Sequence, residues 1–287
     1  MQKTHLQHLI ELLIATLLIS TSGVLGRFIA MPPPVIIWWR CSIAVVVLYL
    51  YCRYKKVNFR IKSTKDKRSF LLAALLLGTH WISYFYALKL SNVALAMLSL
   101  FAFPVITALL EPLFFKQKLK PTHLFLGFLI LLGIYILAPE FNLENSNVKG
   151  ILLGLFSAVC YSIRVLLLKR HVTVYNGTTL MFWQLFVLTI ILAPILYFMD
   201  TSGIQTQFPF VLLLALLTTA IGHTLFIKSL KYFAASTASI INSVQPIFGI
   251  ILAFIFLSEV PTSSTFWGGL LILSTVIIES VRSKKSR

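Results

Sequence analysis

Apolar segments of about 20 residues recur along the whole chain, separated by short polar connections. An α-helix rises about 1.5 Å per residue, so about 20 residues cross the roughly 30 Å hydrocarbon core of a bilayer. We predict ten such segments, at residues 9–29, 35–53, 69–89, 92–115, 121–138, 149–169, 178–198, 209–230, 234–257 and 262–281. The sequence therefore predicts an all-α integral membrane protein with ten transmembrane helices.

The composition agrees with a chain that is dissolved in lipid. Charged residues make up 11% of the chain and hydrophobic residues 58%, whereas a typical soluble domain is about 25% charged. The first apolar segment is longer than the roughly 7–15 residues of a signal peptide core, so we interpret it as a retained helix. We expect no disulfide, metal site or cofactor, because Cys41, Cys52 and Cys160 lie in apolar segments without metal-ligand spacing.

The positive charges are distributed unequally between the two sides of the predicted membrane. With the N-terminus inside, 20 of the 25 lysines and arginines face the cytoplasm and three (Arg27, Lys89 and Lys149) face outward. This asymmetry predicts that both termini are cytoplasmic, in a cell membrane of the bacterial inner-membrane type. It also explains the net charge of +17 without nucleic acid. The basic loop 53–68 fits the same anchoring role, with anionic lipid or a partner as the alternative.

The two halves of the chain resemble each other. Residues 86–117 align with residues 228–259 without a gap, and the matched positions include Leu88 with Leu230, Lys89 with Lys231, Ala96 with Ala238, Pro104 with Pro246 and Leu110 with Leu252. We predict two five-helix repeats, at 1–139 and 149–281, followed by a basic cytoplasmic tail at 282–287. Because five is odd, the second repeat must be inverted, which is a recurring plan in secondary transporters.

The aligned segments also resemble a known family. ALKLSNVALAMLSLFAFPVITALLEPL in the first half, and SLKYFAASTASIINSVQPIFGIILAFIFLSE followed by Val-Pro-Thr in the second, are similar to the EamA family of the drug/metabolite transporter superfamily. The first half departs from the pattern, because Gln117 replaces the acidic residue and Glu111 lies inside a helix. The resemblance implies transport, commonly export, of amino acids or other small metabolites by alternating access.

Ionisable side chains within the membrane need a partner, a cavity or a function, because each costs about 2.5–3.5 kcal/mol to insert. Glu111 lies seven residues after Pro104, with Thr107 between them on the same helix face. We predict that Glu111 binds a substrate amine or carries a coupling proton; the alternative is a structural pair with Arg40 or Arg164. Arg40 lies near a helix end and is interpreted as an interfacial anchor, although it could hold an anionic group.

Other polar and aromatic side chains complete the candidate site. The predicted substrate-binding residues, besides Glu111, are Arg164, His80, Trp81, Tyr84, Tyr161, Asn242, Gln245, His223 and Gln184. The histidines and amides could instead bind neighbouring helices through hydrogen bonds. Pro104 and Pro246 are predicted helix breaks, since proline removes a backbone donor. The glycines at 127, 133, 150, 154, 268 and 269 are interpreted as sites of close helix packing.

The sequence therefore favours a secondary transporter of small molecules over an enzyme. Direct use of ATP is not expected, because there is no Gly-rich phosphate loop. The alternative is an intramembrane enzyme acting on a lipid or small metabolite; a channel or sensor is a third class. Expected partners are a small-molecule substrate, membrane lipids and a coupling proton. No pattern in the sequence predicts the substrate, the direction of transport, the coupling ion or the oligomeric state.

Overall fold

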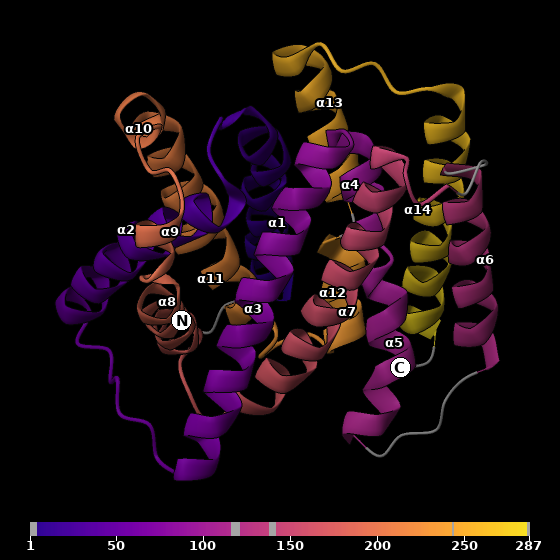
Figure 1. Ribbon diagram of the computed structural model, residues 1–287. Helices are drawn as coiled ribbons and strands as arrows, with labels where there is room; N and C mark the ends of the chain where they lie inside the picture. The colour runs from indigo at the N-terminus through magenta and orange to yellow at the C-terminus, as the bar shows by residue number, and fades with distance from the viewer. Residues whose placement is uncertain (1–4, 116–120, 138–141, 243, 286–287) are drawn as a thin grey trace.

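A computed structural model describes residues 5–115, 121–137, 142–242 and 244–285, and this part of the chain is helical throughout, without strands (Figure 1). The first half contains α1 (His5–Phe28), α2 (Pro33–Tyr54), α3 (Thr64–Leu90), α4 (Val93–Leu100), α5 (Phe103–Phe115) and α6 (Pro121–Leu137). The second half contains α7 (Ser146–His171), α8 (Gly177–Leu192), α9 (Ile195–Phe198), α10 (Ile204–Leu213), η1 (Leu214–His223), α11 (Thr224–Ser229), α12 (Ala235–Asn242), α13 (Gln245–Leu257) and α14 (Ser263–Lys285). Gln117, the end of the first predicted repeat at 139 and the last two residues of the basic tail lie outside the described residues.

Seven helices in the described residues are long and apolar enough to cross a membrane. They are Leu6–Phe28, Pro33–Tyr54, Thr64–Leu90, Val93–Phe115, Ser146–His171, Gly177–Phe198 and Ile204–Ser229. Shorter apolar helices cover Leu124–Leu137 and Gln245–Leu257. Large apolar side chains on α6, among them Phe128 and Leu131, are exposed, as expected of a surface that faces lipid. The prediction of an all-α membrane protein is confirmed.

Two predicted helices are interrupted near their central prolines. The segment 92–115 divides into α4 and α5, which begins one residue before Pro104, and the segment 234–257 divides into α12 and α13, which begins one residue before Pro246. Proline fits the first turn of a helix, where its missing N–H costs nothing, so it favours a new start there. Each of these two segments was predicted as one membrane span with a break at its central proline, and the helices do change at these prolines. Val93–Phe115 as a whole is long and apolar enough to cross a membrane.

The segment predicted at 209–230 is also irregular. The helix starts earlier, at Ile204, so that Pro209 lies inside α10, and ten residues of the segment form the π-helix η1. Within η1 the Thr219 hydroxyl donates to the carbonyl of Leu214, five residues earlier, at 3.2 Å. A π-helix is rare and is frequently found at functional sites, and η1 packs against α1 and α2.

Side-chain caps fix where several helices begin. Ser63 accepts a hydrogen bond from the backbone N–H of Asp66 at the start of α3, and Asn92 does the same for Leu95 at the start of α4. Asn145 and Asn176 cap α7 and α8. Each cap satisfies an amide that the helix leaves unpaired, so the short connections end at defined residues.

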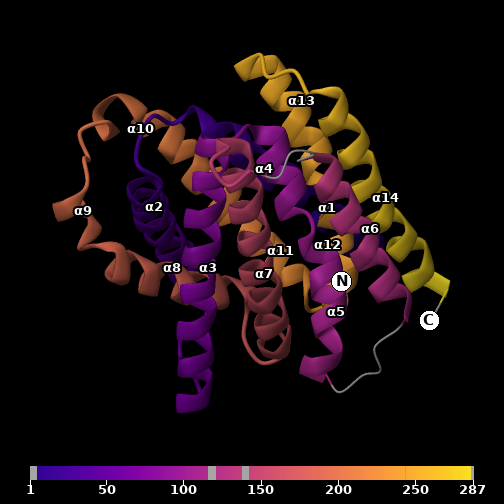
Figure 2. The same cartoon turned by 45° about the vertical axis from the view of Figure 1, so that its right-hand side comes forward.

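The helices pack closely where glycines face neighbouring helices. A Cβ on Gly150 would lie 2.6 Å from the Ser91 hydroxyl, and a Cβ on Gly154 would lie 2.0 Å from the Ser99 hydroxyl. These glycines are four residues apart on α7, so they form one small-residue stripe that lets α7 approach the α3–α4 turn and α4. At one edge of the molecule α6 and α14 lie side by side (Figures 1 and 2). The predicted role of small residues in close packing is confirmed at these two positions and at Gly133, Gly268 and Gly269, where an added Cβ would lie 2.7–2.8 Å from a neighbouring atom. Gly127 has only an ordinary contact.

Candidate functional site

A small cavity lies at the centre of the bundle, between the α4–α5 junction and the start of α13. Its lining residues come from both halves of the chain and are Ile19, Ser22, His80, Trp81, Tyr84, Leu100, Phe101, Phe103, Tyr161, His223, Asn242 and Gln245. Its volume of about 30 Å³ is enough for a water molecule or two, but not for a metabolite. A metabolite could bind here only if the surrounding helices moved apart.

Seven of the residues predicted for the substrate site line this cavity together: His80, Trp81, Tyr84, Tyr161, His223, Asn242 and Gln245. They come from α3, α7, η1 and the α12–α13 junction, which are far apart in the sequence. Their side chains combine aromatic faces with neutral hydrogen-bonding groups, a mixture typical of small-molecule sites.

Aromatic and imidazole rings form the wall on the α3 side. The ring centre of His80 lies 4.5 Å from that of Tyr161, and the Trp81 ring lies edge-on to His223 at 5.2 Å. The Ser157 hydroxyl donates to the His80 carbonyl at 2.9 Å and lies 2.6 Å from His80 Nδ1. Because that hydroxyl has one proton, Nδ1 is the donor of the second bond, which fixes the tautomer of His80.

Two amides form the opposite wall, where α12 gives way to α13. Asn242 Oδ1 accepts hydrogen bonds from the Thr16 hydroxyl, at 3.2 Å, and from the Gln245 side-chain amide. The helix break thus places two side-chain amides beside the cavity, with α1 contributing the third member through Thr16. Such groups can orient a polar ligand once the cavity widens.

Arg164 and Gln184 lie behind the wall of the cavity. Arg164 Nε donates to Gln184 Oε1 at 2.7 Å, and the guanidinium carbon lies 5.7 Å from the centre of the Tyr161 ring. Both residues are buried and neither lines the cavity itself. They are close enough to the predicted site to support it from behind.

Arg40 is fully buried, so its interpretation as an interfacial anchor is wrong. Its Nε and Nη2 atoms donate to the hydroxyls of Thr218 and Thr219 on η1, at 2.7–2.9 Å. Its guanidinium carbon lies 4.0 Å from the centre of the Trp81 ring. The position of Arg40 near a helix end suggested that its side chain is exposed. Instead η1 packs closely against α2 and buries the side chain completely.

Glu111 does not line the cavity. It lies half-buried on α5, and within the described part of the chain it has no hydrogen-bond or ion-pair partner. The structural alternative, an ion pair with Arg40 or Arg164, is therefore not formed here. Its role in substrate or proton binding stays a prediction.

A polar network lies at the face that carries the α3–α4 turn. Arg27 Nε donates to Glu259 Oε1 at 3.2 Å, and Arg27 Nη1 donates to the carbonyls of Leu88 and Lys89 at 2.9 and 3.0 Å. The backbone N–H of Val93 donates to Glu259 Oε2 at 2.8 Å. We call these five residues the Arg27 network; it joins α1, the α3–α4 turn and the residues after α13.

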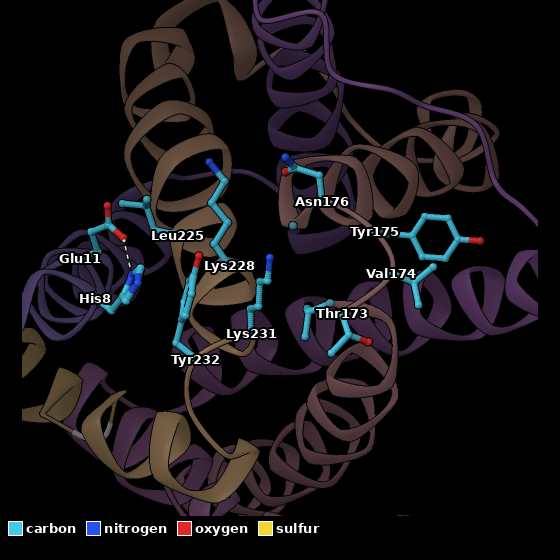
Figure 3. Close-up of a pocket in the computed structure, with 12 residues that line it drawn as sticks. His8, Glu11, Thr173, Val174, Tyr175, Asn176, Leu225, Lys228, Lys231 and Tyr232 are labelled. Atoms are coloured by element: carbon cyan, nitrogen blue, oxygen red, sulfur yellow. Dashed lines mark ion pairs between the residues drawn. The ribbon is translucent and has the colours of Figure 1, made fainter. Parts of the chain in front are cut away.

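A larger pocket lies at the opposite face, where α1 begins, and Figure 3 shows its side chains. It has a volume of about 430 Å³ and lies between the start of α1, the α7–α8 connection and the end of α11. His8 stacks on Tyr232 with ring centres 3.5 Å apart, and Lys228 and Lys231 are further lining residues. Burial, together with the hydrogen bond that it donates to Asp66, raises the pKa of Tyr175, which also lines this pocket. Sequence reasoning missed this pocket, and the clustered lysines were its only signal.

Comparison with known proteins gives a consistent picture. The model of the EamA-like transporter family matches residues 8–138 and 148–280. The chain is 24% identical over 258 residues to a protein named Pseudopaline exporter CntI from Pseudomonas aeruginosa, covering 89% of this chain and 88% of that protein. It is 26% identical over 263 residues to human Solute carrier family 35 member G1, covering 85% and 70%.

Two further matches differ in how much of the chain they cover. A protein from Archaeoglobus fulgidus named Uncharacterized transporter is 31% identical over 160 residues, which are 54% of this chain and 49% of that relative. A solved structure described as "Crystal structure of protein" superposes with a TM-score of 0.73 at 17% identity, covering 99% of this chain and 100% of the other. At that identity the likeness establishes the fold alone.

Proposed function

The chain belongs to the EamA-like transporter family and is a multi-pass membrane transporter, and on that premise we propose that it is a secondary exporter of amino acids or related small metabolites. Substrate would occupy the central cavity, with Trp81, Tyr84 and Tyr161 contacting its apolar part and the amides of Asn242 and Gln245 orienting its polar end. The observation that carries the proposal is that this cavity is built from both halves of the chain.

We propose ten membrane spans arranged as two inverted five-helix repeats. The contacts between helices support this, because they recur when the halves are exchanged: α3 packs on α7 as η1 packs on α1, while α2 with α8 and α6 with α14 pair across the halves. The family model also matches the chain twice, at 8–138 and 148–280. Paired repeats around a central site are the plan of many secondary transporters.

The repeats also supply matched polar contacts at the two faces. The register that aligns residues 86–117 with 228–259 matches Leu88 with Leu230, and the same offset, continued back to the first helix of each half, relates Arg27 to Lys169. Arg27 donates to the Leu88 carbonyl at 2.9 Å, and Lys169 Nζ donates to the Leu230 carbonyl at 2.6 Å. Each cation thus holds the tight turn of one half, at opposite ends of the bundle. Both contacts are formed in this structure, and in alternating access we expect one of them to break while the other stays formed.

The distribution of charge leads us to propose that both termini are cytoplasmic. We expect green fluorescent protein fused to either end to fluoresce and alkaline phosphatase fused to either end to be inactive, because 20 of 25 basic residues lie on the cytoplasmic side of the ten-span arrangement. Paired fusions to green fluorescent protein and to alkaline phosphatase measure the location of each end. Ends on opposite sides of the membrane would contradict the even number of spans and, with it, the inverted repeats.

Transport itself is tested with purified protein in liposomes preloaded with labelled amino acids and small carboxylic acids. We expect saturable efflux without ATP, together with a Glu111→Gln variant whose flux falls more than its thermal stability. Wild-type flux in that variant would remove Glu111 from the mechanism. Conductance without saturation, or chemical conversion of the compound, would instead indicate a channel or an intramembrane enzyme.

A further inference from the structure

Two guanidinium groups lie in the middle of the bundle with only neutral partners. Arg40 and Arg164 are both 0% exposed. The hydrogen-bond partners of Arg40 are the hydroxyls of Thr218 and Thr219, and those of Arg164 are Gln184 and the Met181 sulfur. The Nη1 atom of each arginine is buried and has no hydrogen-bond partner among the described residues.

No carboxylate balances either charge in the part of the chain that the structure describes. The ion pairs among the described residues include Arg27 with Glu259, His8 with Glu11 and His171 with Asp66, and Arg40 and Arg164 have no ion-pair partner there. A buried charge without a counter-charge is strongly unfavourable, since neutral hydrogen bonds replace only part of the lost hydration. Two such charges in the same bundle indicate that something else supplies the negative charge.

Both arginines stand directly behind the wall of the central cavity. The guanidinium carbon of Arg40 lies 4.0 Å from the centre of the Trp81 ring, and that of Arg164 lies 5.7 Å from the centre of the Tyr161 ring. Both rings line the cavity, and the other lining residues include no aspartate or glutamate. In a medium of low dielectric constant the two positive charges therefore act on the cavity across a few ångströms with little opposition.

We propose that the ligand of the central cavity is an anion, with a carboxylate or phosphate group that compensates Arg40 and Arg164 when the cavity opens. Guanidinium groups offer donors in a fixed fork that suits both kinds of group, and the two unpartnered Nη1 atoms are the donors available for it. This inference rests on the proposed transport function and narrows its substrate to an anionic class. The lysines at the larger pocket, Lys228 and Lys231, place further positive charge at one face.

The binding test uses the full-length protein in detergent and compounds matched in shape but not in charge. Succinate and glycerol 3-phosphate are compared with succinamide, glycerol and the cation putrescine by thermal shift, since a ligand that binds the folded state raises the unfolding temperature. We expect stabilisation by one or both anions alone. Stabilisation by the neutral or cationic compounds alone, or by none of the five, would overturn the proposal.

Variants test whether the arginines are responsible. We expect Arg40→Met and Arg164→Met to weaken anion binding about 30-fold or more, since each removes one partner of a buried charge pair. Arg60→Met makes the same change of charge in the exposed loop before α3 and should bind like the wild type. If Arg164→Met does not fold, Arg164→Lys keeps the charge without the fork and should retain the anion preference. Unchanged anion binding in Arg40→Met would contradict the inference.

The stability of the empty protein separates this proposal from a purely structural role. If Arg40 is uncompensated without ligand, Arg40→Met should unfold at the wild-type temperature or higher, because Thr218 and Thr219 keep their own bonds to the Leu214 carbonyl. If Arg40 only clamps α2 to η1, the variant should unfold at a lower temperature, and the inference fails. Saturable flux of neutral or cationic compounds alone would support the transport function and contradict the anion inference. Anion binding without flux would support the anion inference and contradict the transport function.

Discussion

An Arg27→Met variant is expected to open the central cavity toward the face of the α3–α4 turn. The substitution removes donors to Glu259 Oε1 and to the carbonyls of Leu88 and Lys89. Hydrogen bonds that involve a charged group contribute about 1.5–3 kcal/mol each when they are well formed. Because Arg27 is partly exposed, we expect a net effect near the low end for a single such bond, about 1.4 kcal/mol, which is about 10-fold in the population of the open state.

Labelling of a cavity cysteine measures this shift. Ser22 lines the cavity, and the three native cysteines are buried, so a Ser22→Cys protein reports access with little background. With a membrane-impermeant maleimide added at the face of the α3–α4 turn, the Arg27→Met variant should label about 10-fold faster than the same protein with Arg27.

The matched variant is Lys169→Met, because Lys169 holds the corresponding turn at the opposite face. It should slow labelling from the face of the α3–α4 turn and speed labelling from the face where α1 begins. Glu144→Gln, in an exposed loop, should change neither rate. Equal effects of Arg27→Met and Lys169→Met from one face would contradict the assignment of the two closures.

Gly154→Val is expected to prevent normal packing of α7 against α4. The added Cβ would lie 2.0 Å from the Ser99 hydroxyl oxygen and 2.9 Å from the Ser99 Cβ. The hydroxyl could rotate away, but the Cβ is fixed to the backbone, so the helices must separate. Overpacking of a tight interior costs about 3 kcal/mol at the upper end of its usual range, and we expect a loss of at least about that size.

The comparison for this prediction is Gly127→Val. A Cβ on Gly127 would meet only Leu109 Cδ1, at 3.5 Å, which is ordinary van der Waals contact. Thermal unfolding and the yield of monodisperse protein in detergent should fall sharply for the Gly154 variant and change little for the Gly127 variant. Similar behaviour of the two variants would show that the α4–α7 contact is not limiting for folding.

Local patterns in the sequence account for most of the fold. Hydropathy identifies the helical segments, because the bilayer imposes their length, and proline marks the interruptions near Pro104 and Pro246 because its missing N–H and fixed ring favour a helix start. The asparagine caps and the glycines of α7 could also be interpreted from local chemistry. These features depend on residues that are close together in the chain, so they can be predicted from a single sequence.

Features that depend on the packing of distant segments were not predictable in the same way. Arg27 and Glu259 are 232 residues apart, and no local pattern pairs them. Arg40 was placed by its distance from a helix end, but its burial depends on how closely η1 approaches α2. The sequence did identify seven residues that line the cavity, because polar and aromatic side chains within apolar helices are rare enough to stand out.

The Arg27 network has a consequence for the kinetics of the proposed carrier. Glu259 strengthens the closure at one face, whereas the aligned residue of the first half is Gln117, which carries no charge. Without substrate, the carrier would then mostly occupy the conformation that is closed at the face of the α3–α4 turn. Its half-saturation concentrations for substrate would therefore differ between the two sides of the membrane. The final ratio of solute concentrations across the membrane would not change. The Arg27–Glu259 contact alters how quickly equilibrium is reached, whereas the coupling gradient sets the equilibrium itself.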